Sequence, residues 1–201
     1  MTSLLFVVLA YLMGSLSFAV IISRSFGLPD PHEYGSGNPG ATNVLRTGNK
    51  AAAALTLLGD GLKGWLALSV AKAWAIPAGV EQPVLAAVAL AVFLGHLWPV
   101  FHGFRGGKGV ATAAGVLIGI QPLLGLATFA TWIIVVYFSR ISSLGAICAA
   151  VFAPFYDLLI WGGGDEMVAL FPMCLLLIWR HEGNIRKLMA GTESKIGNKA
   201  T

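Results

Sequence analysis

Charged residues are scarce in this chain, and their scarcity excludes a soluble globular domain. Only 11% of the 201 residues are Asp, Glu, Lys or Arg, and 57% are hydrophobic, whereas soluble domains carry about a quarter charged residues. Mean hydropathy is +0.79, and apolar runs long enough to cross a bilayer recur along the chain. The composition therefore predicts an all-α polytopic membrane protein, with one membrane-embedded domain covering residues 1–201.

Cysteine is nearly absent as well. Cys148 and Cys174 both lie in apolar runs, with no CxxC or Cys/His spacing that would indicate a metal site or a disulfide framework. We expect them to be small buried residues, and we expect neither a metal nor a cofactor. The net charge of +4 is modest, and no basic face is free of the membrane, so nucleic-acid binding is not predicted.

The motifs of covalent catalysis and of nucleotide hydrolysis are missing. The chain has no GxSxG elbow, no HxxxxD pair and no cysteine in a polar segment, so no covalent acyl-enzyme intermediate is expected. A Walker A loop is excluded because Gly103 and Gly107 enclose only three residues and Gly109 follows Lys108. These absences favour a site that binds oxyanions and orients two substrates.

Seven apolar segments are present instead. Their predicted ranges are 4–22, 51–70, 84–101, 110–120, 123–138, 143–161 and 167–179. The first lacks a basic region before it, so it is not expected to be a cleaved signal peptide. The fourth is short for a full crossing and is either a short tilted span or a re-entrant helix.

The distribution of Lys and Arg favours seven crossings, with the N-terminus periplasmic and the C-terminus cytoplasmic. Lys72 alone then faces outward and Lys63 lies within a span, while the cytoplasmic side receives Arg24, Arg46, Lys50, Arg105, Lys108, Arg140, Arg180, Arg186, Lys187, Lys195 and Lys199. A re-entrant fourth segment would disturb this asymmetry. The connector between the second and third spans contains Pro77 and Glu81.

Three polar clusters consequently converge on one membrane face. The first covers residues 35–43 and is followed by Arg46, whose guanidinium can form a bidentate pair with a phosphate. Its side-chain donors to oxygen are Ser36, Asn38, Thr42 and Asn43. The alternative is a turn that leads into a helix capped by Thr42 or Asn43.

The second cluster, residues 103–112, is a cationic loop rich in glycine. Glycines allow backbone N–H groups to approach a ligand, and a helix is predicted to restart at Val110. Backbone amides at a helix start, together with Arg105 and Lys108, can bind an anion. The alternative is a flexible loop whose two cations serve only membrane topology.

The third cluster begins at Arg180, and three further ionisable residues lie inside spans. His181 and Asn184 share one helical face; alternatively, this segment is a basic amphipathic tail that lies on anionic lipid. His96, near the inner end of the third span, is a functional candidate because ionisable residues are costly in a membrane. Asp60 and Lys63 have the i, i+3 spacing of an intrahelical ion pair.

These clusters resemble the motifs of one family. Residues 35–46, residues 106–112 and His181-x-x-Asn184-Ile185 look like the three motifs of the bacterial acyl-phosphate:glycerol-3-phosphate acyltransferases. Asp60-x-x-Lys63-Gly64 and Gly95-His96-x-x-Pro99 are similar to further signatures, so the resemblance covers almost the whole chain. One departure is Lys187, which stands where the family has arginine, and we do not assign it to the site.

The resemblance implies that the 1-hydroxyl of glycerol 3-phosphate attacks the carbonyl of a long-chain acyl phosphate, giving lysophosphatidic acid and phosphate. It implies a site on the cytoplasmic side of the bacterial inner membrane, with a functional link to the enzyme that produces acyl phosphate. The implied catalytic residues are Ser36, His96 and Asn184. The implied substrate-binding and phosphate-binding residues are Gly37, Asn38, Thr42, Asn43, Arg46, Gly106, Gly107, Lys108, Gly109, Thr112 and His181.

Several alternatives remain at this level. Lys108 and Arg46 can each hold either substrate's phosphate, and the hydroxyl proton can pass to His96 or to a substrate phosphate. A small organic-phosphate transporter would use the same cationic loop, but transporters place such charges near the bilayer midplane and often contain internal repeats. A lipid-binding subunit without catalytic activity would leave the polar chemistry of residues 36–46 unused.

Overall fold

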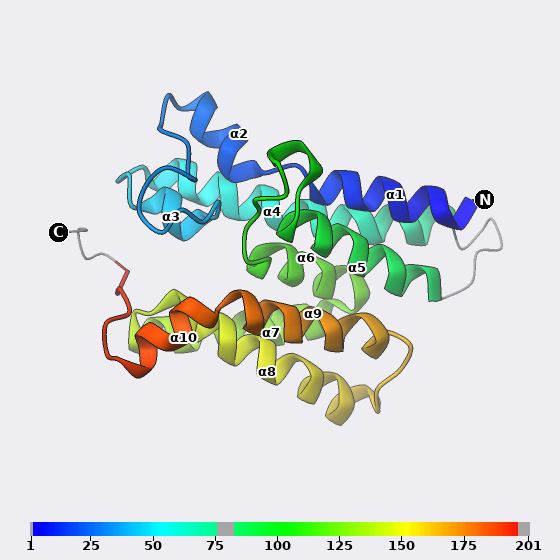
Figure 1. Ribbon diagram of the computed structural model, residues 1–201. Coiled ribbons are helices and arrows are strands. Elements are labelled where there is room, and N and C mark those ends of the chain that lie inside the picture. The colour runs from blue at the N-terminus through cyan, green and yellow to red at the C-terminus, as the bar shows by residue number, and fades with distance from the viewer. Residues whose placement is uncertain (1, 76–82, 197–201) are drawn as a thin grey trace.

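The computed structural model describes residues 2–75 and 83–196, and every regular element within them is a helix (Figure 1). The elements are α1 Thr2–Gly14, α2 Phe18–Ser25, α3 Ala41–Leu45, α4 Lys50–Val70, η1 Ala71–Ala75, α5 Pro83–Leu97, η2 Val100–His102, α6 Val110–Ile120, α7 Pro122–Ser139, α8 Ser142–Trp161, α9 Met167–Arg180 and α10 Glu182–Met189. Pro77 and Glu81 of the predicted connector, and Lys199 of the tail, lie outside the described residues.

The predicted first span is two helices rather than one. α1 and α2 meet at an angle of 43°. The break frees the carbonyl of Leu16, which accepts a hydrogen bond from Lys63 Nζ at 2.7 Å, while Ser15 Oγ donates back to the Tyr11 carbonyl at 2.9 Å. A sharp bend of this kind occurs where other groups satisfy the interrupted helical ladder, and here a lysine of α4 does so.

The helices differ strongly in length, and therefore in whether they can cross a membrane. Four helical stretches are long and apolar enough to cross a membrane, namely Lys50–Trp74, Pro83–His102, Pro122–Ser139 and Ser142–Trp161, and the bent pair α1 and α2 makes up to five. α6, with 11 residues, and α9, with 14, are shorter than the about 20 residues of an ordinary span. The predicted boundaries of the short fourth segment are confirmed, and the chain is a multi-pass helical protein.

Glycines permit the closest helix pairings. A Cβ built on Gly64 of α4 would lie 2.4 Å from the Thr112 carbonyl oxygen of α6, and one on Gly115 of α6 would lie 1.8 Å from the Gly61 carbonyl oxygen. Small residues at such crossings let membrane helices approach closely. Thr112 Oγ1 then donates to the Asp60 carbonyl at 3.0 Å, which fixes the start of α6 beside Asp60.

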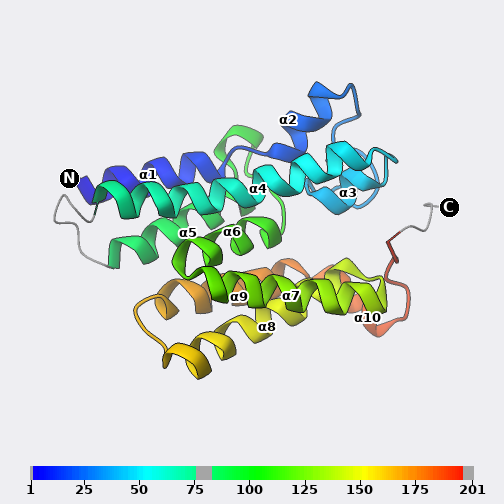
Figure 2. The ribbon, with the colours of Figure 1, turned by 180° about the vertical axis from the view of Figure 1, so that it is seen from behind.

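The helices form two layers. α1, α4, α5 and α6 make one layer and α7, α8 and α9 make the other, as both views show (Figures 1 and 2). α3 and α10 lie at the same end of the molecule, the end away from the start of α1. We call this the site end, because the segments that carry the first and third polar clusters meet there.

Candidate active site

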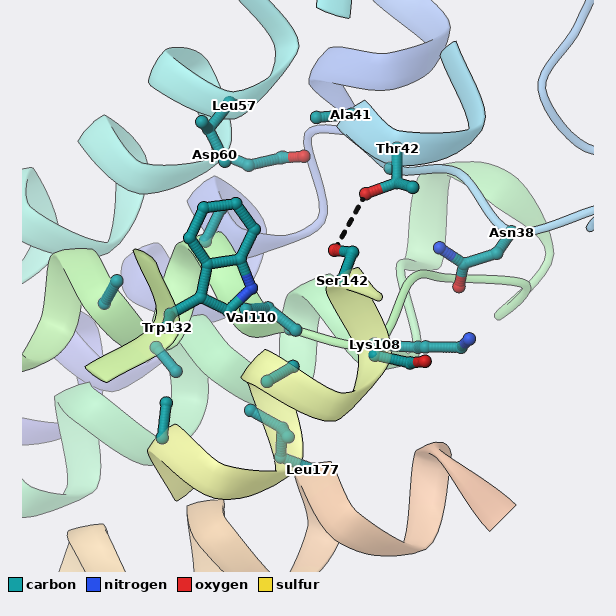
Figure 3. A pocket seen from close by; sticks show the side chains of 18 of the residues that line it. Asn38, Ala41, Thr42, Leu57, Asp60, Lys108, Val110, Trp132, Ser142 and Leu177 are labelled. Atoms are coloured by element: carbon teal, nitrogen blue, oxygen red, sulfur yellow. Dashed lines mark hydrogen bonds between the residues drawn. The ribbon is translucent and has the colours of Figure 1, made fainter. Parts of the chain in front are cut away.

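A large cavity opens between the two layers at the site end. Its volume is about 1490 Å³, more than the roughly 300–1000 Å³ of an ordinary small-ligand pocket. Figure 3 labels some of the residues that line it, and the lining divides into two parts. The chamber is its polar part, whose lining includes Ser36, Asn38, Thr42, Arg46, His96, Lys108, His181, Asn184 and Glu193; the groove is its apolar part, whose lining includes Ala146, Ala149, Ala150, Ala153, Leu170, Met173 and Leu177.

The second cluster, residues 103–112, which we call the glycine loop, packs directly on the end of α5. The Gly107 N–H donates to the His96 carbonyl at 3.1 Å, and a Cβ on Gly106 would lie 2.2 Å from that same oxygen. Gly109, with φ of +83°, caps α6, and a Cβ there would lie 2.3 Å from Phe93 Cε2. Only glycine permits this approach. The Gly107 amide is engaged within the protein, so the predicted anion cradle does not include it in this state.

Arg180 holds the other side of this loop. Its guanidinium donates to the Gly106 carbonyl at 2.8 Å and to the Gly107 carbonyl at 3.2 Å. The sequence placed Arg180 only at the head of the third cluster, since an arginine at the end of an apolar helix is ordinary in membrane proteins. The structure makes it one of the residues that join the third cluster to the second.

A histidine just before the first cluster joins that part of the chain to the second cluster. His32 Nδ1 lies 2.7 Å from Asp30 Oδ1, and His32 Nε2 lies 2.9 Å from the Arg105 carbonyl oxygen. Each ring nitrogen therefore faces an oxygen acceptor, one on each loop. Because the two residues are 73 positions apart, no local sequence pattern indicates the contact.

Lys108 projects from the loop into a polar network. Its ammonium donates to Asn184 Oδ1, while Asn184 Nδ2 and Ser143 Oγ both donate to Glu193 Oε1 at 2.6 Å. Burial lowers the pKa of Lys108 to about 8, with Glu193 opposing the shift and neighbouring cations adding to it. A bound anion would favour the charged ammonium and so oppose this shift, which makes the position suited to phosphate.

The hydrogen-bond partners of two histidines in the chamber determine which ring nitrogen carries the proton. His181, 2% exposed, bonds through Nδ1 to the Leu177 carbonyl at 2.7 Å. Because a carbonyl only accepts, the proton is on Nδ1 and Nε2 is left as an acceptor. Burial lowers the pKa of His181 to about 4, so this ring is neutral near pH 7.

His96 has the opposite tautomer. Lys63 Nζ lies 3.0 Å from His96 Nδ1 and 2.8 Å from Asp60 Oδ1. Asp60 Oδ1 lies 3.5 Å from the same His96 Nδ1, which is too far for an ordinary hydrogen bond. The nearer ammonium of Lys63 can only donate, so His96 Nδ1 accepts and the ring proton is on Nε2. That atom faces the loop, since a Cβ on Gly107 would lie 2.3 Å from it. The predicted ion pair of Asp60 and Lys63 is confirmed, and it also orients His96.

The sequence that builds this site matches a known protein family. The model of the glycerol-3-phosphate acyltransferase family, described as "Glycerol-3-phosphate acyltransferase", matches residues 4–191. The chain belongs to this family.

Relatives in the glycerol-3-phosphate acyltransferase family match along nearly the whole chain. Those of Cupriavidus taiwanensis and Ralstonia nicotianae, both named glycerol-3-phosphate acyltransferase, are 61% and 59% identical over 99% and 98% of this chain and 98% and 95% of their own lengths. Two crystal structures of PlsY, an integral membrane glycerol 3-phosphate acyltransferase, in its glycerol 3-phosphate and lysophosphatidic acid forms, match with TM-scores of 0.89 and 0.87. Each is 37% identical and covers 98% of this chain and 96% of its own. The protein is thus an integral-membrane acyltransferase, as its motifs suggested.

Most residues singled out by their resemblance to this acyltransferase family meet in the cavity, but some do not line it. Gly37, Gly106, Gly107 and Thr112 lie outside its lining, and Thr112 is fully buried with its hydroxyl bonded to α4. These residues shape the loops around the chamber. That these four residues bind substrate remains a prediction.

Asn43 lines the cavity, yet its side chain is used within the first cluster. Its Oδ1 accepts from the Ser36 N–H at 3.0 Å, and its Nδ2 donates to the carbonyls of Pro31 and Tyr34 at 2.9 and 3.1 Å. The alternative in which Thr42 or Asn43 caps the following helix is wrong, because the N-cap of α3 is Gly40. Asn43 therefore folds the loop that presents Ser36.

The C-terminal segment and the start of α8 contribute residues that the sequence did not indicate. Ser194 Oγ accepts from Arg46 Nη2 at 2.8 Å, and Ser142 Oγ lies 3.2 Å from Thr42 Oγ1 (Figure 3). Ser143 was predicted only to begin a span and Ser142 to precede it, and serine is common at such positions. Their partners lie far away along the chain, so the sequence carried no signal for them.

Proposed function

We propose that this protein transfers a fatty acyl group from acyl phosphate to the 1-hydroxyl of glycerol 3-phosphate. The products are 1-acylglycerol 3-phosphate, which is lysophosphatidic acid, and inorganic phosphate, in the first acylation step of phospholipid synthesis. The observation that carries this proposal is the continuity of the cavity, in which a chamber with Arg46 and Lys108 opens into an apolar groove. Both substrates need a site for phosphate, and the donor also needs a site for a hydrocarbon chain.

The chamber groups suit transition-state stabilisation better than covalent catalysis. Phosphate is a good leaving group, so the donor needs no activating nucleophile, and preorganised cations near the developing charge are the main requirement. Lys108 and Arg46 provide that charge. Ser36 and Asn184 can orient the glycerol hydroxyls and the phosphate oxygens, since each offers hydrogen-bonding groups to the cavity.

The tautomers decide which groups can move the proton. His96 presents Nε2–H and is a hydrogen-bond donor, so it polarises rather than deprotonates. His181 Nε2 is an acceptor but a weak base, because burial lowers the pKa of its ring to about 4. We therefore assign the hydroxyl proton to a phosphate oxygen of the substrates. The new bond between the glycerol oxygen and the carbonyl carbon forms first, the bond from that carbon to the phosphate oxygen then breaks, and the leaving phosphate departs with the electron pair of that bond.

The site is proposed to face the cytoplasm of the bacterial inner membrane, with seven crossings and a periplasmic N-terminus in one domain of residues 1–201. Support comes from the cations at the site end, among them Arg46, Lys108 and Arg180, because cytoplasmic loops are enriched in such residues. Arg140 also lies near this end, since its carbonyl accepts from the Ile196 N–H at 2.7 Å. An acyl-phosphate-producing enzyme on the same side would supply the donor.

The test is turnover by purified protein with defined donors. Palmitoyl phosphate and glycerol 3-phosphate should give inorganic phosphate and lysophosphatidic acid in equal amounts, whereas palmitoyl-CoA should give neither product. Turnover with the CoA thioester and none with palmitoyl phosphate would overturn the donor assignment.

Lys108→Ala should remove most of this activity. Loss of one preorganised donor at a developing charge costs about 10²–10³ in kcat, and here a full positive charge is lost. Lys187→Ala is the matched control, because Lys187 is a nearby exposed lysine of α10 that the site does not use. Near-normal activity of the Lys108→Ala protein would remove the loop from the mechanism.

A further inference from the structure

Trp132 of α7 lines the cavity where the chamber meets the groove. Figure 3 shows its indole between Asp60 and Val110, with the ring nitrogen on the side that faces Val110 and Ser142. The ring is held in place by Phe129, stacked at a centroid distance of 5.9 Å, and by Gly145, where a Cβ would lie 3.0 Å from Trp132 Cδ1. Its position is therefore fixed by packing.

The indole N–H is an unused hydrogen-bond donor. Trp132 Nε1 is buried and has no hydrogen-bond partner among residues 2–75 and 83–196. Buried indole N–H groups usually find a partner, and a buried polar group without one calls for an explanation. A substrate atom that enters the cavity would supply the partner.

The layout of the cavity indicates which substrate atom that is. An acyl phosphate must place its phosphate in the chamber, near Lys108, and its chain in the groove. Its carbonyl therefore lies at the boundary, which is marked by the contact of Thr42 with Ser142 (Figure 3). Trp132 is at this boundary, and an N–H can donate only to an oxygen of the donor substrate there.

A second unpaired group on the same helix does not compete for this role. Thr128 Oγ1 is buried without a partner in the described part of the chain, and Thr128 also lines the cavity. It lies one helical turn before Trp132. Because α7 ends near the site end at Ser139, Thr128 is farther along the groove, where the chain of an acyl phosphate has only methylene groups.

We propose that Trp132 donates its indole N–H to the carbonyl oxygen of the acyl donor and stabilises the negative charge that develops on that oxygen. The inference rests on the proposed function. The glycerol oxygen attacks the carbonyl carbon, and the π electron pair moves to the oxygen held by Nε1–H. The pair then returns, the bond to phosphate breaks, and the hydroxyl proton ends on phosphate. A donor shielded from water is strongest in this role.

The experiment compares turnover with binding of an analogue that lacks the carbonyl. Trp132→Phe keeps an aromatic ring and removes the donor, so kcat with palmitoyl phosphate should fall about a hundredfold to a thousandfold, with KM for glycerol 3-phosphate unchanged. Hexadecyl phosphate keeps the phosphate and the chain, so its inhibition constant should be equal in the wild-type and variant proteins. Trp74→Phe, at a side chain 72% exposed, should leave both values unchanged.

A second replacement separates the N–H from packing. Benzothienylalanine at position 132 has nearly the shape of tryptophan without the N–H, and it should reproduce the loss in kcat. Normal kcat with this residue would overturn the proposal, as would a hexadecyl phosphate inhibition constant that rises in step with the loss in kcat. If only an acyl thioester supports turnover, the proposed donor fails, whereas the same comparison on the thioester still decides the role of Trp132.

Discussion

The chamber and the groove of the same cavity are built in different ways. Chamber side chains are fixed by hydrogen bonds within the protein, as Lys108 is by Asn184 and Arg46 is by Ser194. The groove is lined by alanines of α8 and by aliphatic side chains of α9. Electrostatic catalysis requires dipoles and charges that are oriented before the reaction, whereas burial of a hydrocarbon chain depends on apolar area rather than direction. Substitutions in the chamber should therefore change rate, and substitutions in the groove should change chain preference.

The largest expected effect comes from Lys63, which lies beneath the chamber. Lys63→Met leaves Asp60 as an uncompensated buried charge, and breaking a buried ion pair costs about 3–5 kcal/mol of stability. It also removes the partner that fixes the His96 tautomer. Thermal unfolding of the purified protein should shift strongly downward, and activity should fall at temperatures where the variant is still folded.

Lys72→Met provides the matched control for Lys63. Lys72 donates to the carbonyls of Gly119 and Ile120 at the end of α6, far from the chamber. Loss of these bonds should cost about 1–3 kcal/mol and should leave the turnover of the folded protein intact. Equal loss of turnover in the two variants would contradict the separation of the chamber from the rest of the bundle.

Gly107→Ala should have the next largest effect. A Cβ there would lie 2.3 Å from His96 Nε2 and 2.9 Å from the Pro39 carbonyl oxygen, so the loop must move away from the chamber. A displacement of about 1 Å at a catalytic group can cost about a hundredfold in rate. The measurement is kcat with palmitoyl phosphate.

Gly183→Ala is the control for the glycine loop. Beyond its chain neighbours and its own helix backbone, no atom of the described residues lies within 4 Å of a Cβ at Gly183, and this position is helical, so alanine should be accepted and even favoured. If both alanine variants keep normal kcat, the close contact between the loop and His96 has no catalytic importance.

The sequence predicted the helices and loops of the site better than the hydrogen bonds between them. Residues 110–120 were predicted to the residue because a glycine loop and Pro122 bound them, and both interrupt helices. The break between α1 and α2 was missed, since hydropathy does not register a Ser-Leu-Ser sequence whose free carbonyl is bonded by Lys63, 47 residues away. Hydrophobicity and glycine content are local signals, whereas such partnerships are not.

The same distinction holds for the chamber. Local composition indicated all three polar clusters and the position of Lys108. It could not indicate that Glu193 accepts from Ser143, 50 residues away, or that Arg180 holds Gly106, 74 residues away. Serine, glutamate and arginine are unremarkable at those positions, and only the packing of α8, α9 and the segment after α10 brings them to the chamber.

The pH dependence of the reaction should distinguish the two parts of the cavity further. Burial lowers the pKa of Lys108 to about 8, so the side chain loses its positive charge as pH rises through that value. Apparent affinity for the phosphate that it binds should fall about tenfold per pH unit above this pKa, while preference among acyl chains should stay constant. The measurement is KM for each substrate between pH 6.5 and about 9.5.

Lys108→Arg tests whether this titration belongs to Lys108. Arginine keeps its charge at all of these pH values, so the variant should show a flatter profile, although its absolute activity should be lower because its fork differs in shape from an ammonium. An unchanged inflection near pH 8 in the variant would assign the titration to another group.

The smallest effect should come from the groove. Ala153 of α8 is 1% exposed and lines the cavity beyond the other alanines of this helix. Ala153→Leu should fill the part of the groove that holds the end of a long chain. Each excluded methylene forfeits about 0.8 kcal/mol of burial, so kcat/KM for palmitoyl phosphate should fall several-fold relative to that for decanoyl phosphate.

Leu159→Ala, at an exposed position of the same helix, should leave this ratio unchanged, and KM for glycerol 3-phosphate should not respond to either substitution. If Ala153→Leu instead lowered kcat equally for both chain lengths, the groove would be acting on the orientation of the carbonyl. The assignment of rate to the chamber and of chain preference to the groove would then be wrong.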